Sequence, residues 1–226
     1  MNRKERRAAK FKAPKPTLRQ LATSLCQAAP WCIRSRWPAS YAPSVEMSFA
    51  GREVLRRHQF AAEMVSCVLM IGNAKTMLCV GDNRAGYDLF ARRGGVKHLP
   101  SYEEWQRGLG ANTSGAHAVL KARDGDARAF LDLTFGQVAI KTKGAIPVPP
   151  AFAGFGNIEW PSAEIEGVWF AYTEAPEPPE MQKITANEWS GLIDDLATLV
   201  GIALDCRNDG RAFEAEMERQ TRQLGR

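Results

Sequence analysis

The clearest pattern in the chain is a pair of short apolar segments, 116–121 and 129–134, separated by the dipeptide Asp124-Gly125. Asp-Gly between two strand-like segments predicts a hairpin, because a two-residue type I′ turn needs positive φ at both central positions. With this turn, His117 faces Asp132 across the hairpin, and their Cβ atoms lie roughly 5 Å apart. A three-residue loop would instead place the two side chains on opposite faces.

Apolar positions at helical or alternating spacing predict further elements along most of the chain. Helices are expected over 17–29, with Thr17 as N-cap and Pro30 as terminator, and over 44–58. A Thr185-x-x-Glu188 capping box predicts a helix to about residue 206, and a charged helix follows over 211–224. Strands are expected over 62–71, 76–80 and 164–172, with irregular chain over 31–38 and a covering loop over 144–150.

Charge is distributed unevenly between one end of the chain and the rest. The net charge is +5 over 226 residues, yet residues 1–20 hold eight basic side chains and one acid, which leaves −2 for the remainder. We therefore expect a basic, disordered arm over 1–20 that could contact nucleic acid or an acidic surface. An α+β domain is expected over 21–175, a proline-rich acidic linker over 176–184, and a C-terminal helical extension over 185–226.

Composition argues against several classes of protein. Apolar stretches fall short of the roughly 20 residues that a membrane span needs, and the basic N-terminus lacks the apolar region of a secretory signal. The cysteines are odd in number, lack C-x-x-C spacing and suit a reducing cytoplasm. The three histidines show no i, i+4 pairing, so neither a metal nor another cofactor is expected.

A family resemblance rests on the segments around the predicted helix at 44–58 and the hairpin. The stretch from Arg52 to Val65 resembles the helix–strand junction of transglutaminase-like, papain-fold proteins, and the strands of His117 and Asp132 resemble that family's histidine and aspartate strands. The proline-rich segment 147–150 is similar to that of uncharacterised bacterial proteins of this type, and arylamine N-acetyltransferases are more distantly similar. The resemblance covers roughly residues 30–173 and implies a papain-like α+β domain with a central helix packed on an antiparallel sheet.

The same resemblance places Ser44 where the family has its nucleophilic cysteine, at the N-terminus of the central helix. A helix N-terminus lowers the pKa of a thiol, whereas a serine depends on its base. Three interpretations are open. In the first, Ser44 is only an N-cap and the site is degenerate. In the second, Ser44 is a nucleophile with His117 as base and Asp132 as the group that orients it. In the third, Cys32, in a loop at 31–33, folds back to serve His117, or the register that leads to Ser44 is wrong.

Two functions follow from these interpretations. The first, implied by the resemblance, is acyl transfer or amide hydrolysis on a peptide or small amide, with a catalytic set drawn from His117, Asp132, Ser44 and Cys32. The second is a catalytically degenerate member of the fold that binds a protein partner, through the old cleft or the C-terminal helices. The helix opened by Thr185 has enough apolar surface either to dock on the core or to pair with a second copy.

Overall fold

One antiparallel sheet organises the protein. A computed structural model describes residues 15–38, 41, 43–93, 101–104, 117–157 and 159–224. The sheet has the strand order β5-β4-β3-β1-β7-β6, and β2 pairs with the far half of β1. The strands are β1 (Ala61–Gly72), β2 (Met77–Val80), β3 (His117–Asp124), β4 (Ala127–Asp132), β5 (Phe152–Phe155), β6 (Ser162–Ile165) and β7 (Val168–Glu174).

The sheet curls so that strands distant in its order face each other. The ring of Phe152 on β5 contacts those of Phe170 and Tyr172 on β7, at centroid distances of 5.1 and 6.2 Å. Inside the curl lies an aromatic-rich core that includes Phe130 and Cys67. Because side chains alternate along a strand, the intervening residues, such as Leu120 and Leu131, face a second core outside the curl.

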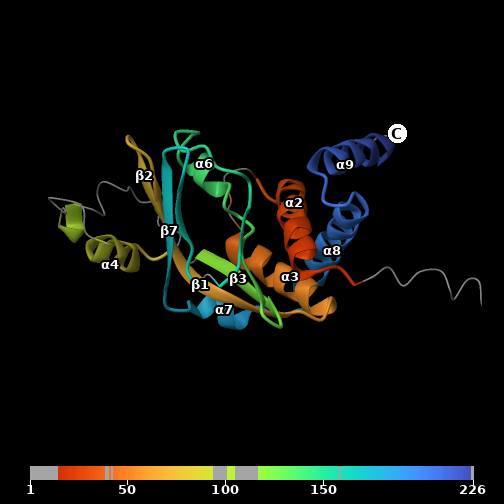
Figure 1. Ribbon diagram of the computed structural model, residues 1–226, viewed down its shortest axis with the longest axis horizontal. Helices are drawn as coiled ribbons and strands as arrows, with labels where there is room; N and C mark the ends of the chain where they lie inside the picture. The colour runs from red at the N-terminus through yellow and green to blue at the C-terminus, as the bar shows by residue number, and fades with distance from the viewer. Residues whose placement is uncertain are drawn as a thin grey trace, which may run out of the picture.

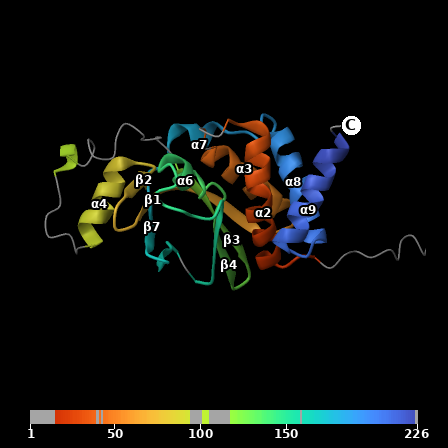
Figure 2. The same cartoon turned by 90° about the horizontal axis from the view of Figure 1, so that it is seen from above.

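Three helices cover the outer face at the hairpin end of the sheet (Figure 1). They are α2 (Leu18–Arg36), α3 (Ser44–Arg57) and α8 (Ser190–Asp205). A fourth helix, α4 (Asn83–Arg93), lies at the other end of the molecule, and α9 (Gly210–Leu224) extends beyond α8 (Figure 2). Two further helices have five residues each: α6 (Gln137–Lys141) and α7 (Pro179–Lys183).

The α+β class is confirmed, while several elements differ from the prediction. Pro30 lies inside α2, which continues to Arg36, so 31–38 is mostly helical instead of irregular. An internal proline removes one helical hydrogen bond, but Ala29 and Cys32 on either side of it are fully buried, and this packing holds the helix together. The predicted strand over 164–172 is two strands, β6 and β7, joined by a tight turn in which Gly167 has a φ of 76°.

The ends of the chain also depart from the expected domain boundaries. The predicted basic arm lies outside the described residues as far as residue 14, but Thr17 caps α2 and the helix begins within the arm's predicted range. At the other end, α8 starts at Ser190, after the turn that the Thr185–Glu188 box holds. Its residues Leu192, Ile193, Leu196 and Val200 belong to the same core as α2 and α3. The structure therefore shows docking on the core, and α8 is not a separate extension.

Candidate functional site

The hairpin brings His117 and Asp132 together, by a register that differs from the predicted one. Leu120 pairs with Leu131 and Asp124 with Ala127, so the two-residue loop is Gly125-Asp126. This register is shifted by two residues from the predicted one, which keeps His117 and Asp132 on the same face but makes them diagonal neighbours. Their side chains still meet, with His117 Nε2 2.9 Å from Asp132 Oδ2. The direct neighbour of His117 on the other side is Cys67 of β1.

Asp132 is the centre of a polar cluster buried inside the curled sheet. His117 and Asp132 are both 0% exposed. Besides His117, the Tyr172 hydroxyl donates to Oδ2 at 2.9 Å. The Thr134 backbone N–H and hydroxyl donate to Oδ1 at 2.9 and 3.2 Å. A buried carboxylate with four hydrogen bonds is fully compensated for its loss of water.

The electrostatics of the cluster favour an ionised Asp132. Burial by itself raises the pKa of Asp132, but the His117 imidazole and the hydrogen bonds from Thr134 and Tyr172 outweigh burial and hold the pKa below its ordinary value. The pKa of Tyr172 moves the other way, well above its ordinary value, because of burial and the neighbouring Asp132 charge. Tyr172 therefore remains a protonated donor to the carboxylate.

The second nitrogen of His117 is also bonded. Gln137 Nε2, on α6, lies 3.2 Å from His117 Nδ1 and 3.3 Å from Thr134 Oγ1. The Thr134 hydroxyl proton goes to Asp132, so its oxygen accepts from Gln137 and fixes which way the amide faces. Nδ1 consequently accepts a hydrogen bond, and the imidazole proton lies on Nε2, where it is donated to Asp132. Asp132 and Gln137 thus orient the imidazole of His117, and each of its ring nitrogens is engaged.

The structure places Cys32 away from this cluster. Cys32 is on helix α2, not in a loop, and it is buried in the outer core. Burial raises the pKa of its thiol to about 11, with smaller opposing effects of Arg36 and Asp195. The expectation that Cys32 folds back from a loop to serve His117 is therefore wrong: this thiol is a packed, protonated core residue.

Ser44 lies in the helix layer outside the sheet. The N-cap of α3 is Pro43, so Ser44 is the first residue of the helix and not its N-cap, and it is 4% exposed. One turn later, Ser48 donates its hydroxyl to the Ala118 carbonyl at 2.8 Å, which holds α3 beside the start of β3. The helix packs on the face that carries Leu120, whereas His117 points into the curl. Gln137 occupies the ring nitrogen that would take a proton from Ser44.

Comparison with known proteins adds no identity. No family model and no curated protein matches the chain. One solved structure, described only as "the crystal structure of genomics APC5867", aligns at a TM-score of 0.45 with 16% identity, over 84% of this chain and 81% of that one. Likeness at this level carries no conclusion about fold or function.

Three members of the cluster were missed from the sequence. Thr134 follows Asp132 by two residues and bonds to it as an Asx-type turn, which the Asp-Leu-Thr sequence signals. Tyr172 alternates with buried residues on β7, and a buried tyrosine hydroxyl needs a partner. No sequence signal pointed to Gln137, because its position beside His117 results from the short helix α6 that follows β4.

The part of the chain that the structure describes holds no group of three or more histidine, cysteine, aspartate or glutamate side chains that could ligate a metal ion. Among the same residues, no helix has both the length and the apolar character needed to cross a bilayer.

Proposed function

We propose that this protein is a catalytically degenerate member of the transglutaminase-like, papain-like group, in which the histidine–aspartate pair now supports the fold and the protein acts by binding. The supporting observation is the bonding of His117. A general base needs an accessible lone pair within reach of a nucleophile, and here Asp132 and Gln137 engage the two ring nitrogens of a side chain with no exposed surface.

The nature of the remaining candidates agrees with this proposal. Cys32 is held as a thiol by burial. Cys67, the cross-strand neighbour of His117, has its pKa raised well above the ordinary value by burial and by Asp132. A thiol in that state is a poor nucleophile, because the reactive form is the thiolate.

A second function, acyl transfer or amide hydrolysis with Ser44 as nucleophile, draws on one feature of the same cluster. Asp132 holds His117 through Nε2, as the carboxylate of a catalytic triad holds and orients its histidine. Activity would require Gln137 to release Nδ1 and a substrate to reach the ring.

Reaction with a fluorophosphonate probe separates the two functions. Native wild-type protein, His117→Ala and Ser44→Ala should all label at the same background rate, with mass spectrometry to locate the adduct. Labelling of Ser44 in the wild-type protein that disappears in His117→Ala would contradict the binding role and establish the catalytic one. Gln137→Ala is the informative companion variant: if only this change produced His117-dependent labelling, Gln137 would be the group that silences the site.

A further inference from the structure

A groove lies at the end of the curled sheet that carries the hairpin turn, apart from the buried cluster. Its volume is about 440 Å³, within the range of small-molecule sites. The groove is lined by strands β1, β3 and β4 and by the loop between β5 and β6, near the turn of the hairpin. The lining residues are Ala61, Ala62, Glu63, Lys121, Ala122, Arg123, Arg128, Ala129, Asn157 and Glu159.

Two arginines in the wall of the groove face each other directly. Arg123 and Arg128 are cross-strand partners next to the turn of the hairpin. Like charges at such positions repel each other and destabilise the sheet. Several arginines elsewhere in the described residues have a carboxylate partner, as Arg36 has in Asp195 and Arg57 in Asp194. Within the same described part of the chain, neither Arg123 nor Arg128 forms an ion pair.

The third cation of the groove is held in place. Lys121 Nζ lies 3.8 Å from the centroid of the Trp160 ring, which in turn contacts Phe130 of the inner core at 6.2 Å. Lys121 lies two residues from Arg123 on the same face of β3, and its direct neighbour on β1 is Glu63. The cation–π contact holds the ammonium of Lys121 over the Trp160 ring.

We propose that this groove binds a small ligand through an oxyanion group, a phosphate or a carboxylate, held by the paired guanidiniums of Arg123 and Arg128. Guanidinium forks form two parallel hydrogen bonds to such groups, and a shared anion removes the repulsion between the two arginines. Asn157 adds an amide donor or acceptor, and Glu63 and Glu159 offer acceptors to hydroxyl or amino groups elsewhere on the ligand. The inference deepens the proposed binding role by naming its ligand chemistry, but it concerns a site separate from His117.

The test is a thermal-melt titration of the full chain with sodium phosphate, sodium acetate and sodium chloride at matched ionic strength. Chloride controls for general screening of charge. We expect phosphate, acetate or both to raise the melting temperature beyond the chloride effect, and the effective salt then identifies the group recognised. Arg123→Gln and Arg128→Gln should each weaken the apparent affinity about tenfold or more. Arg211→Gln, which removes one exposed charge from α9, should leave it unchanged.

Two results would overturn the inference: no anion effect beyond chloride in the wild-type protein, or equal effects in all three variants and the wild type. Loss of folding in a variant is checked by its melt in chloride alone. There, Arg128→Gln should melt at or above the wild-type temperature, because it relieves the arginine–arginine repulsion. Fluorophosphonate labelling reports on Ser44 and His117, so failure of the proposed function and failure of this inference are distinguishable.

Discussion

At the scale of the residue, Asp132 is the side chain whose hydrogen bonds matter most for the stability of the fold. It is removed from water, carries a charge, and owes its compensation to donors on β3, β7 and the turn after β4. Removing one donor from a buried charged group costs more than removing the same donor at the surface. The cluster therefore joins β3, β7 and the turn after β4. Its contribution to the free energy of unfolding can be measured by removing one donor at a time.

Replacing Tyr172 by phenylalanine is the simplest such measurement. We expect Tyr172→Phe to lower the free energy of unfolding by about 1–3 kcal/mol, because Asp132 Oδ2 loses one of its two donors in a buried site. Tyr41→Phe is the matched control: its hydroxyl donates to Glu46, but the side chain is 45% exposed, and the loss should be below about 0.5 kcal/mol. Urea denaturation followed by tryptophan fluorescence measures both, and equal losses would show that the cluster is not a distinctive source of stability.

Asp132 also predicts a pH dependence of stability. Its pKa is lower in the folded protein than the ordinary value of 3.8, so in acid the unfolded chain binds more protons than the folded protein. The contribution of this group is complete above about pH 4 and is lost as the pH falls through the folded pKa. We expect the difference in unfolding free energy between the wild type and Asp132→Asn to shrink from pH 6 to pH 2. A difference that stays constant over that range would contradict an ionised Asp132.

At the scale of the element, the hairpin shows what the sequence determines and what it leaves open. The alternation of apolar and polar residues and the Asp-Gly turn predict the two strands. They also predict that His117 and Asp132 lie close together on one face of the hairpin. The register does not, because the turn can use Asp124-Gly125 or Gly125-Asp126. In the structure Gly125 has a φ of 57°, while Asp124 and Asp126 keep negative φ, so glycine takes the first central position. Helix α4 was not predicted from the sequence, although Asp82 at its start accepts from the Arg84 N–H, as an N-cap does.

Helix α3 contains a glycine whose role can be tested against a matched site. A Cβ on Gly51 would lie 2.7 Å from Leu133 Cδ1 and 2.8 Å from Leu120 Cδ1, and both leucines are fully buried. Although alanine normally stabilises a helix by about 1 kcal/mol relative to glycine, we expect Gly51→Ala to destabilise the protein by about 1–3 kcal/mol through overpacking. Gly201→Ala on α8, where nothing lies within 4 Å, should be stabilising by up to about 1 kcal/mol. Thermal or urea denaturation measures the change in stability of both variants. A change of the same sign in both would contradict close packing at Gly51.

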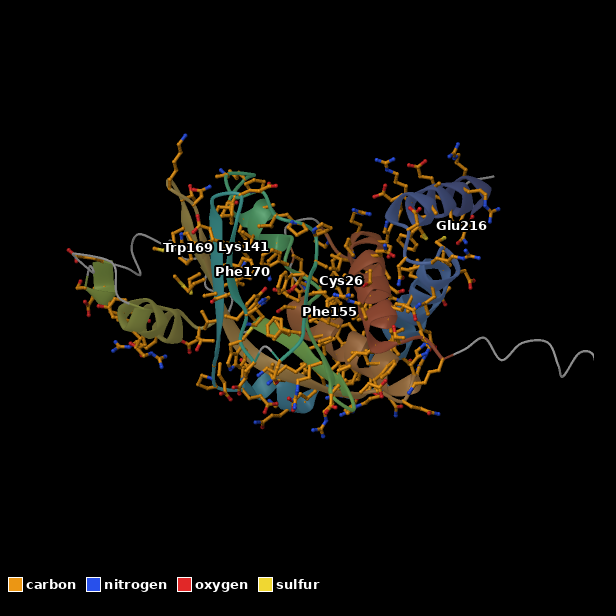
Figure 3. The ribbon with its side chains drawn as sticks, in the orientation of Figure 1. Cys26, Lys141, Phe155, Trp169, Phe170 and Glu216 are labelled. Atoms are coloured by element: carbon orange, nitrogen blue, oxygen red, sulfur yellow. The ribbon has the colours of Figure 1, made fainter. Side chains whose placement is uncertain are left out.

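At the scale of the whole molecule, the C-terminal helices are part of the fold. Side chains of α8 fill the outer core, and ion pairs of Arg36 with Asp195 and Arg57 with Asp194 flank the contact. Helix α9 has a shallower attachment, in which Phe213 packs against Trp31 of α2 at 6.4 Å. One turn after Phe213, Glu216 accepts hydrogen bonds from Arg219 and Gln220 of the same helix (Figure 3). The acidic, proline-rich segment before α8 has the composition of a linker. Composition alone does not show that the helix after this segment packs on α2 and α3.

A core substitution in α8 tests this integration. We expect Leu196→Ala to lower the free energy of unfolding by about 2–5 kcal/mol and to preserve a single transition, because Leu196 is fully buried against α2 and α3. Leu199→Ala, at a half-buried position one turn along, should cost less. The transition is followed by circular dichroism and fluorescence together. An unchanged main transition, with a separate early loss of helix, would show instead that α8 folds as an independent unit.

The turn between α8 and α9 ties the two ends of the chain together. Asn208 donates to the Gln20 carbonyl at 3.0 Å and accepts from Ser24, and Gln27 donates to the Asn208 carbonyl at 2.8 Å. Helix α2 is thus the first described helix to leave the ribosome, and these hydrogen-bond partners of it are synthesised nearly 190 residues later. Contacts so distant in sequence slow folding and leave an apolar helix face open to other chains during synthesis. We therefore expect chains stalled before α8 to be the aggregating species when this protein is overproduced, and a circular permutant that joins the two ends to refold faster than the natural order.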